Sequence, residues 1–146
     1  MYQEKFRTLI DQVYDTMNVA AADRTYEVCQ LEVEGAQFTL AYSTTDADKV
    51  ISFCEYGVPP AERRAEILAR LLEVNVLSYD SKAPHYAINP ESGAVVFILQ
   101  ISLDDLTAER LIELLALQAM GASTWRITHF LEDRELALEQ VLASEE

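Results

Sequence analysis

The sequence contains few of the residues on which nucleotide-binding and metal-binding sites depend. It has 4 glycines and 2 histidines among 146 residues. The glycines are scattered and form no phosphate-binding loop, which disfavours nucleotide binding through backbone amides. His85 and His129 have no short ligand spacing, and a metal site at either would need cysteines or carboxylates supplied by the fold. We therefore predict that the protein uses no metal and no cofactor.

Nucleophilic groups are also scarce. The two cysteines, Cys29 and Cys54, lie in apolar strand-like runs, where burial raises a thiol pKa and reduces the supply of thiolate. They are typical of reduced core residues in a cytoplasmic protein. Ser92 stands in a turn without the strained elbow that exposes a catalytic serine. We predict no catalytic residue, and a thiol-dependent enzyme is the least favoured alternative.

Positive charge and long apolar runs are the remaining deficits. Lysine and arginine together number 11, against 25 aspartates and glutamates, which gives a formal net charge of -14. Nucleic acid and anionic membranes carry the same sign of charge, so the sequence argues against both as partners. No apolar run is long enough to cross a bilayer, and residues 1–18 have the pattern of an amphipathic helix rather than a signal peptide. We expect a cytoplasmic protein that is not inserted in a membrane.

Half of the residues are hydrophobic, which at this length suffices for the core of one domain. We expect residues 1–146 to form that domain, with an acidic helical tail from about residue 132. Hydrophobic periodicity predicts a helix at 2–18, strands at 26–33, 36–43 and 49–56, a helix at 61–79, strands at 85–89 and 94–102, and a helix from 104 to 130. Asp104 or Asp105 is the predicted cap of this last helix, which should continue through Gly121. The order α-β-β-β-α-β-β-α predicts an α+β fold with an antiparallel five-stranded sheet and three main helices.

The first two strands specify their own register. A two-residue turn at Glu34-Gly35 predicts a hairpin. The expected partners are Val33 with Ala36, Leu31 with Phe38, Cys29 with Leu40, and Glu27 with Tyr42. The apolar side chains then share one face, and the mixed outer face is left for solvent or for a ligand.

The helix predicted at residues 61–79 has more apolar surface than one neighbour can cover. Its apolar arc spans about half of the circumference, whereas a surface helix needs about a third. Arg64 and Asn75 also project into this arc, and a buried polar group must find a partner. We interpret one flank as packed on the protein's own core and the other as a contact with a second copy of the chain. In the alternative, a loop or the C-terminal segment covers that flank within one monomer.

Three local motifs point to a known family. They are Leu71-Leu72-Glu73-Val74-Asn75, the turn at 89–93 that leads into Ala94-Val95-Val96-Phe97, and the spacing of Leu115, Ala122 and Trp125. In this order, and with the acidity of the chain, they resemble the class I type III secretion chaperones of the Tir-chaperone-like family. The resemblance implies a homodimer through the central helix and no use of ATP. It also implies a cytoplasmic chaperone that binds the N-terminal chaperone-binding segment of a secreted effector and keeps it extended and competent for secretion.

The apolar arc and the resemblance together predict two sets of site residues. The expected dimer interface comprises Arg64, Ile67, Leu68, Leu71, Leu72 and Asn75. The expected effector-binding residues, on the outer sheet face, are Tyr26, Val28, Ala41, Val50, Cys54 and Tyr56. The alternative for the second set is that they are scattered surface apolar residues. The alternative for the whole protein is a regulatory module of the same fold that binds another bacterial protein.

Overall fold

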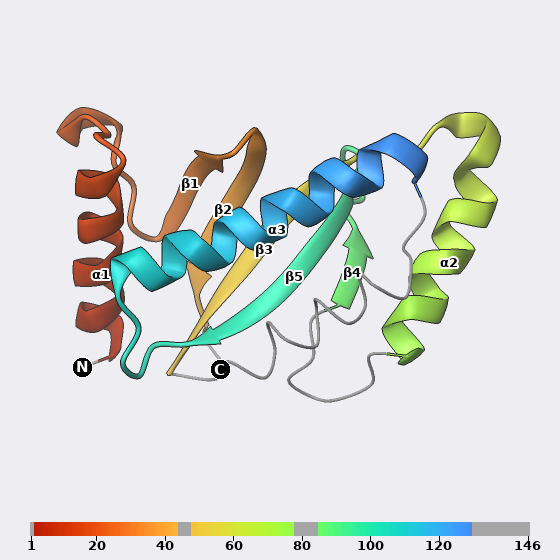
Figure 1. The fold of residues 1–146 in the computed structure, drawn as a ribbon. Coiled ribbons are helices and arrows are strands. Elements are labelled where there is room, and N and C mark those ends of the chain that lie inside the picture. Colours follow the sequence, from red (N-terminus) through yellow and green to blue (C-terminus); the bar gives the residue numbers. More distant parts are fainter. Residues whose placement is uncertain (1, 44–47, 78–84, 130–146) are drawn as a thin grey trace.

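The computed structural model describes residues 2–43, 48–77 and 85–129, and their helices and strands follow the predicted order (Figure 1). The helices are α1 (Tyr2–Thr16), α2 (Arg64–Leu77) and α3 (Ala108–Thr128), with short 3-10 turns at Ala21–Asp23 and Ala61–Arg63. The strands are β1 (Val28–Val33), β2 (Ala36–Tyr42), β3 (Lys49–Gly57), β4 (His85–Ile88) and β5 (Val95–Ser102). The helical tail predicted from about residue 132 lies outside the described residues.

The described strands form one antiparallel sheet in the order β1-β2-β3-β5-β4, so β1 and β4 are its edges. The β1–β2 register is the predicted one, with Val33 opposite Ala36 and Leu31 opposite Phe38. The ladder starts at Val28, two residues later than predicted, so Tyr26 precedes the strand. The tight turn and the alternation of apolar side chains were sufficient to fix this hairpin.

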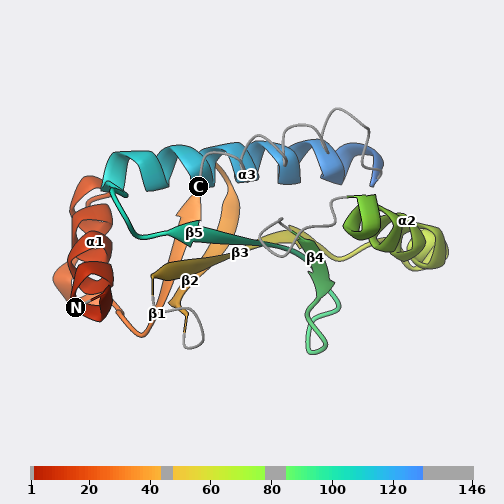
Figure 2. The ribbon, with the colours of Figure 1, turned by 90° about the horizontal axis from the view of Figure 1, so that it is seen from below.

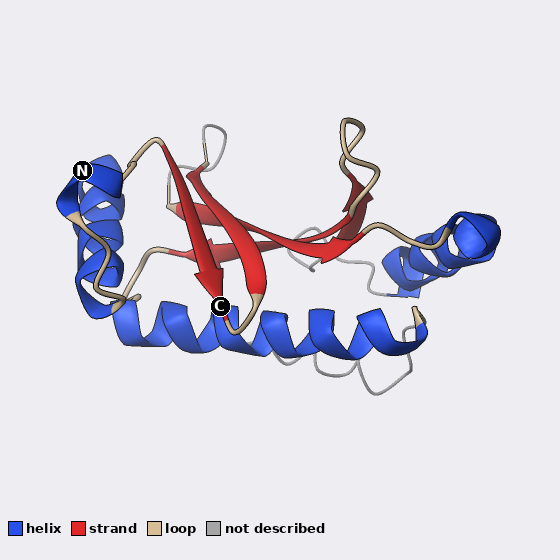
Figure 3. Ribbon diagram, turned by 90° about the horizontal axis from the view of Figure 1, so that it is seen from above, coloured by secondary structure: helices blue, strands red, loops and turns tan. Residues whose placement is uncertain are grey.

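The helices lie on one face and at the two ends of the sheet (Figures 1 and 3). α3 runs along one face, α1 packs beside the N-terminal half of α3, and α2 lies beyond β4 at the opposite end (Figure 2). The core fills the space between the sheet, α1 and α3. Its largest fully buried side chains are Tyr14, Ile10, Phe38, Leu40, Phe97, Leu99, Ile101, Leu111, Leu115 and Trp125. No helix within the described ranges covers the other face of the sheet, which we call the outer face.

The structure corrects the predicted phase of β3. Cys54 lies opposite Phe38, and Val50 lies opposite Tyr42, so both side chains point toward α3. Val50, Cys54 and Tyr56 are all buried, and their predicted placement on the outer face is wrong. Both faces of this strand carry apolar residues, so its period-two pattern could not decide which set points inward.

The cap of α3 also differs from the prediction. The N-cap is Thr107, whose Oγ1 accepts a hydrogen bond of 3.1 Å from the amide of Arg110. Asp104 and Asp105 belong instead to the turn between β5 and α3, and Asp105 has a positive φ of 60°. An N-cap residue has extended backbone dihedrals, which Thr107 adopts and Asp105 does not.

α3 continues through Gly121, as predicted, for 21 residues. A Cβ at position 121 would lie 2.8 Å from the hydroxyl oxygen of Tyr56, so glycine permits the close approach of α3 to β3 here. His129 follows in the left-handed conformation, with φ 59°, and ends the helix. No helix of the described chain is both long and apolar enough to span a bilayer.

Candidate protein-binding surfaces

The apolar arc of α2 is divided between a buried and an exposed flank. Ile67, Leu71 and Val74 are buried, and α2 packs mainly on β4 and on the preceding 3-10 turn. Leu72 and Val76, on the other flank, keep 67% and 73% of their surface exposed. Large apolar side chains this exposed are candidates for contact with another protein. The described chain thus leaves open the flank that the sequence predicted to contact a second copy.

A small hollow continues this exposed flank toward the sheet. Its volume is about 240 Å³. It is lined by Leu68, Leu71, Leu72, Asn75, Tyr86, Ala87 and Ile88. Four of the six residues predicted for the dimer interface therefore lie together beside β4. Ile67 is buried, and Arg64 is exposed beside Gly93 in the β4–β5 turn.

Asn75 has a polar partner within its own chain. Its Nδ2 donates to the carbonyl oxygen of Tyr86 at 3.0 Å, and the amide nitrogen of Tyr86 donates to its Oδ1 at 2.8 Å. The side-chain amide of Asn75 thereby satisfies the backbone N–H and C=O of Tyr86, which point away from β5. The pair fixes α2 against the edge of the sheet.

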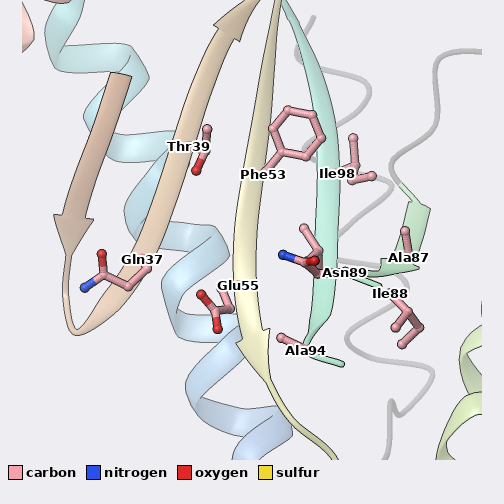
Figure 4. Close-up of a pocket in the computed structure, with 10 residues that line it drawn as sticks. Gln37, Thr39, Phe53, Glu55, Ala87, Ile88, Asn89, Ala94 and Ile98 are labelled. Carbon is pink, nitrogen blue, oxygen red and sulfur yellow. The ribbon is translucent and has the colours of Figure 1, made fainter. Parts of the chain in front are cut away.

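The outer face of the sheet contains a larger hollow, with a volume of about 410 Å³ (Figure 4). Its floor is a row of paired residues, since Thr39 lies opposite Phe53 and Phe53 lies opposite Ile98. The lining residues are Gln37, Thr39, Phe53, Glu55, Ala87, Ile88, Asn89, Ala94, Val96 and Ile98. An apolar floor with a few polar side chains around it is suited to a peptide segment that brings both apolar side chains and backbone polar groups.

The predicted effector-binding residues fall in three different places. Val28 and Ala41 are directly paired on β1 and β2, and Val28 is 47% exposed. Val50, Cys54 and Tyr56 are buried beneath α3, as described above. Sequence reasoning missed Phe53, Val96 and Ile98 as outer-face residues. The available signal was that β5 is apolar on both sides, whereas only one of its faces packs on α3.

Tyr26 belongs to the joint between α1 and the start of β1. Its hydroxyl donates to the Oδ1 of Asp11 at 2.5 Å, and the guanidinium of Arg7 lies 4.0 Å from the centre of its ring. Arg24 adds ion pairs to Asp11 at 3.2 Å and to Asp15 at 2.8 Å. The hydrogen bond from Tyr26, and then that from Arg24, hold the pKa of Asp11 below its ordinary value. These contacts anchor α1.

The cysteines are poorly suited to nucleophilic chemistry. Cys29 and Cys54 are both free and buried. Burial raises the pKa of Cys54 to about 12, and it raises the pKa of Cys29 as well. Neither thiol supplies appreciable thiolate at neutral pH. Among the residues whose positions are described, no three His, Cys, Asp or Glu side chains are grouped to hold a metal ion.

The family can now be assigned. The chain matches the model of the Tir chaperone protein (CesT) family over residues 8–126. The chain belongs to this family. The resemblance inferred from the local motifs is thereby confirmed, and the match includes all the elements from within α1 to the last turns of α3.

Solved structures of similar fold include a type III secretion chaperone and a chaperone–effector complex. A chain of the HopA1–SchA chaperone–effector complex is 15% identical, covers 86% of this chain and 96% of its own length, with a TM-score of 0.61. A chain of the ExsC–ExsE complex is 15% identical, with coverages of 86% and 94% and a TM-score of 0.59. A chain of the complex between the Yersinia pestis type III secretion chaperone SycH and a stable fragment of YscM2 is 14% identical, with coverages of 82% and 98% and a TM-score of 0.55. Among curated protein sequences, none matches significantly.

Proposed function

We propose that the protein is a homodimeric chaperone of the bacterial cytoplasm. It binds the N-terminal chaperone-binding segment of a type III secreted effector and keeps it extended and competent for secretion. Membership of the Tir chaperone family supports this class of function. The observation on this chain that carries the proposal is the presence of two separate apolar surfaces, the flank of α2 and the hollow on the outer sheet face.

The exposed flank of α2 is the proposed dimer interface. Leu72 and Val76 would form its centre, with Leu68 and Leu71 beside them and Arg64, Ile67 and Asn75 at or behind the contact. Burying exposed apolar side chains stabilises association by about 25 cal/mol per Å² of area removed from water, before the costs of association are subtracted. The charged side of α2, which carries Glu66 and Glu73, would remain in water.

The outer sheet face is the proposed effector surface. A segment held in extended conformation can place alternate side chains on Phe53 and Ile98 while its backbone bonds to polar groups at the rim. Val28 and Ala41 extend the surface toward β1, whose outer edge has no strand neighbour among the described residues. Holding a segment in this way needs neither catalysis nor ATP, so the proposal includes neither. The net charge of -14 would discourage association of these apolar surfaces with other copies.

The effector surface can be tested with two variants that each replace an apolar side chain by serine. Phe53 lines the hollow on the outer face, whereas Ile127 is exposed on α3, which covers the opposite face of the sheet. Effector segments recovered with the protein from its native cell would be titrated against the wild type, Phe53→Ser and Ile127→Ser. We expect Phe53→Ser to weaken binding at least about tenfold, as for a central interface residue, and Ile127→Ser to change it little.

Two other outcomes would contradict the proposal. Equal effects of both substitutions would remove the hollow as the binding surface. A dimer that retains some other bacterial protein, and no secreted effector, would favour the regulatory module of the same fold.

A further inference from the structure

The hollow on the outer face has one charged side chain among its described lining residues, that of Glu55. Glu55 follows Phe53 by two residues on β3 and lies between Gln37 and Asn89 (Figure 4). Side chains two residues apart on one face of a strand are separated by about 7 Å, so the carboxylate lies at one end of the apolar floor. A segment that covers this floor therefore also approaches Glu55.

The carboxylate of Glu55 has no hydrogen bond or ion pair with any other described residue. Arg126 of α3 contacts only the backbone here, since its Nη2 donates to the carbonyl oxygen of Glu55 at 3.1 Å and its Nε donates to that of Tyr56 at 2.7 Å. Gln37 donates from its Nε2 to the Oε1 of Glu32 at 2.9 Å. The negative charge of Glu55 is therefore available to a partner.

Lysine and arginine are scarce on the outer face. Among the outward positions of the described strands, one carries such a residue, Lys49 at the start of β3. Lys49 precedes Glu55 by six residues, which is about 20 Å along the strand. Its Nζ is paired with the Oδ2 of Asp48 at 3.5 Å. The surroundings of the hollow are therefore negative, like the chain as a whole.

Asn89 adds a hydrogen-bond donor to the same hollow. Its Oδ1 accepts a hydrogen bond of 2.9 Å from the amide of Glu91 in the turn after β4. Its Nδ2 has no partner among the described residues and is directed toward β3 in Figure 4. A peptide carbonyl can accept from this group, whereas the carboxylate of Glu55 requires a donor or a cation. The two groups together fit a peptide that brings a backbone acceptor and a positive side chain.

The cost of covering Glu55 distinguishes between peptides. An apolar side chain placed against it would remove water from the carboxylate without replacing it, and an acidic side chain would add repulsion. A lysine or arginine compensates the lost hydration, and an arginine can do so with two parallel hydrogen bonds. Such a pair is worth little in open water, so the discrimination depends on the segment that covers the hollow.

We propose that Glu55 selects effector segments with a lysine or arginine two residues from the apolar side chain that packs on Phe53. This inference rests on the proposed function, in which the hollow holds an extended segment. Residues two apart in an extended segment face the same way and are separated by about 7 Å, which matches the spacing of Phe53 and Glu55. The partner is therefore a segment with alternating apolar and basic side chains on one side.

Selection from short random peptides displayed on phage tests this preference. The targets are the full-length wild type, Glu55→Lys and the control Glu109→Lys, which makes the same change of charge at an exposed position of α3 on the opposite side of the sheet. We expect the wild type and Glu109→Lys to select peptides with a lysine or arginine two residues from a large apolar residue. Glu55→Lys should select aspartate or glutamate at that place.

Titration of one selected peptide measures the pairing. The peptide, and a variant with glutamine in place of its basic residue, are titrated against the wild type and Glu55→Gln. We expect the replacement to weaken binding to the wild type at least about fivefold, and binding to Glu55→Gln less than about twofold. General attraction to the negative protein would weaken both alike, because Glu55→Gln keeps almost all of the charge.

The outcomes separate this inference from the proposed function. If peptides that fail to bind Phe53→Ser show the same charge preference on the wild type and Glu55→Lys, the role of Glu55 is overturned and the hollow remains the effector surface. Equal weakening in the wild type and Glu55→Gln has the same meaning. Peptides that bind Phe53→Ser as well as the wild type would overturn both. Failure to select any peptide would overturn the role of Glu55, while the effector titrations still test the hollow.

Discussion

The contact between Gly121 and Tyr56 allows a quantitative test of how α3 packs on the sheet. An alanine Cβ at position 121 would lie 2.8 Å from the Tyr56 hydroxyl oxygen, closer than real Cβ contacts. The ring cannot easily move aside, because it is buried against Tyr86, Phe97 and Trp125, with ring centroids 5.4, 5.9 and 5.8 Å away. Overpacking of this kind costs about 1–3 kcal/mol, while alanine gains about 1 kcal/mol over glycine in a helix. We expect Gly121→Ala to destabilise the protein by about 1 kcal/mol.

Removing the hydroxyl should reverse the sign of this effect. In a Tyr56→Phe background the nearest ring atom to the new Cβ is the Cζ at 3.8 Å, an ordinary contact. Gly121→Ala should then stabilise the protein by about 0.5–1 kcal/mol, through helix propensity alone. The double-mutant cycle thus has an expected coupling energy of about 1–3 kcal/mol.

The assay is urea unfolding of all four proteins at one protein concentration, followed by the fluorescence of Trp125, the single tryptophan. Ser123→Ala, at an exposed position on the same helix, is the control for propensity without a contact. The reasoning fails if Gly121→Ala stabilises the wild type, or if it destabilises both backgrounds equally.

Three further predictions concern α2 and α1. Leu72→Asp places a charge at the centre of the proposed dimer interface and should convert dimer to monomer in sedimentation experiments, whereas Glu73→Ala on the charged side of α2 should not. A dimer that is unaffected by Leu72→Asp would place the interface elsewhere. Asn75→Ala removes both hydrogen bonds to the backbone of Tyr86 and should lower the free energy of unfolding by about 1–3 kcal/mol. Asn75→Asp loses the hydrogen bond to the carbonyl oxygen of Tyr86 but retains the oxygen that accepts from its amide. An unchanged free energy of unfolding in Asn75→Ala would mean that water replaces the side-chain amide without loss. The pKa of Asp11 is lower in the folded state than in the unfolded state, so its carboxylate stabilises the fold above the unfolded pKa, and this contribution is lost as the pH falls through the folded pKa. Below about pH 4 the unfolding midpoint should therefore drop less steeply with pH in Asp11→Asn than in the wild type.

The parts of the fold that were predictable are those specified by local chemistry. The Glu34-Gly35 turn and the alternation of apolar side chains on both sides of it predicted the β1–β2 register. The apolar pattern on both sides of Gly121 predicted that α3 continues through this residue. The phase of β3 was not predictable, because its inward and outward positions are both apolar and only pairing with β2 decides between them. Similarly, the cap at Thr107 depends on a turn whose backbone angles the sequence did not reveal.

The candidate surfaces divide in the same way. The exposed flank of α2 followed from one helix's own periodicity and was predicted. The hollow on the outer face requires residues from four strands, and it depends on β5 lying between β3 and β4, which brings Ile98 beside Phe53. No spacing in the sequence encodes that neighbourhood. The hydrogen-bond partner of Asn75 was not predicted for the same reason, since the position of Tyr86 beside α2 depends on the place of β4 at the edge of the sheet.

The amide pair between Asn75 and Tyr86 makes the two borders of the sheet unequal. At β4 the outward N–H and C=O of Tyr86 are already bonded to Asn75, so an incoming strand could not pair there without breaking two hydrogen bonds. At the other edge, β1 has no strand neighbour on its outer side among the described residues. If two copies dimerise through α2, which lies next to β4, the free β1 edges of the two sheets lie at opposite ends of the dimer. One effector chain would then have to cross the dimer interface to bind both β1 edges. The length of the effector between its two binding segments would determine whether the dimer carries one effector molecule or two.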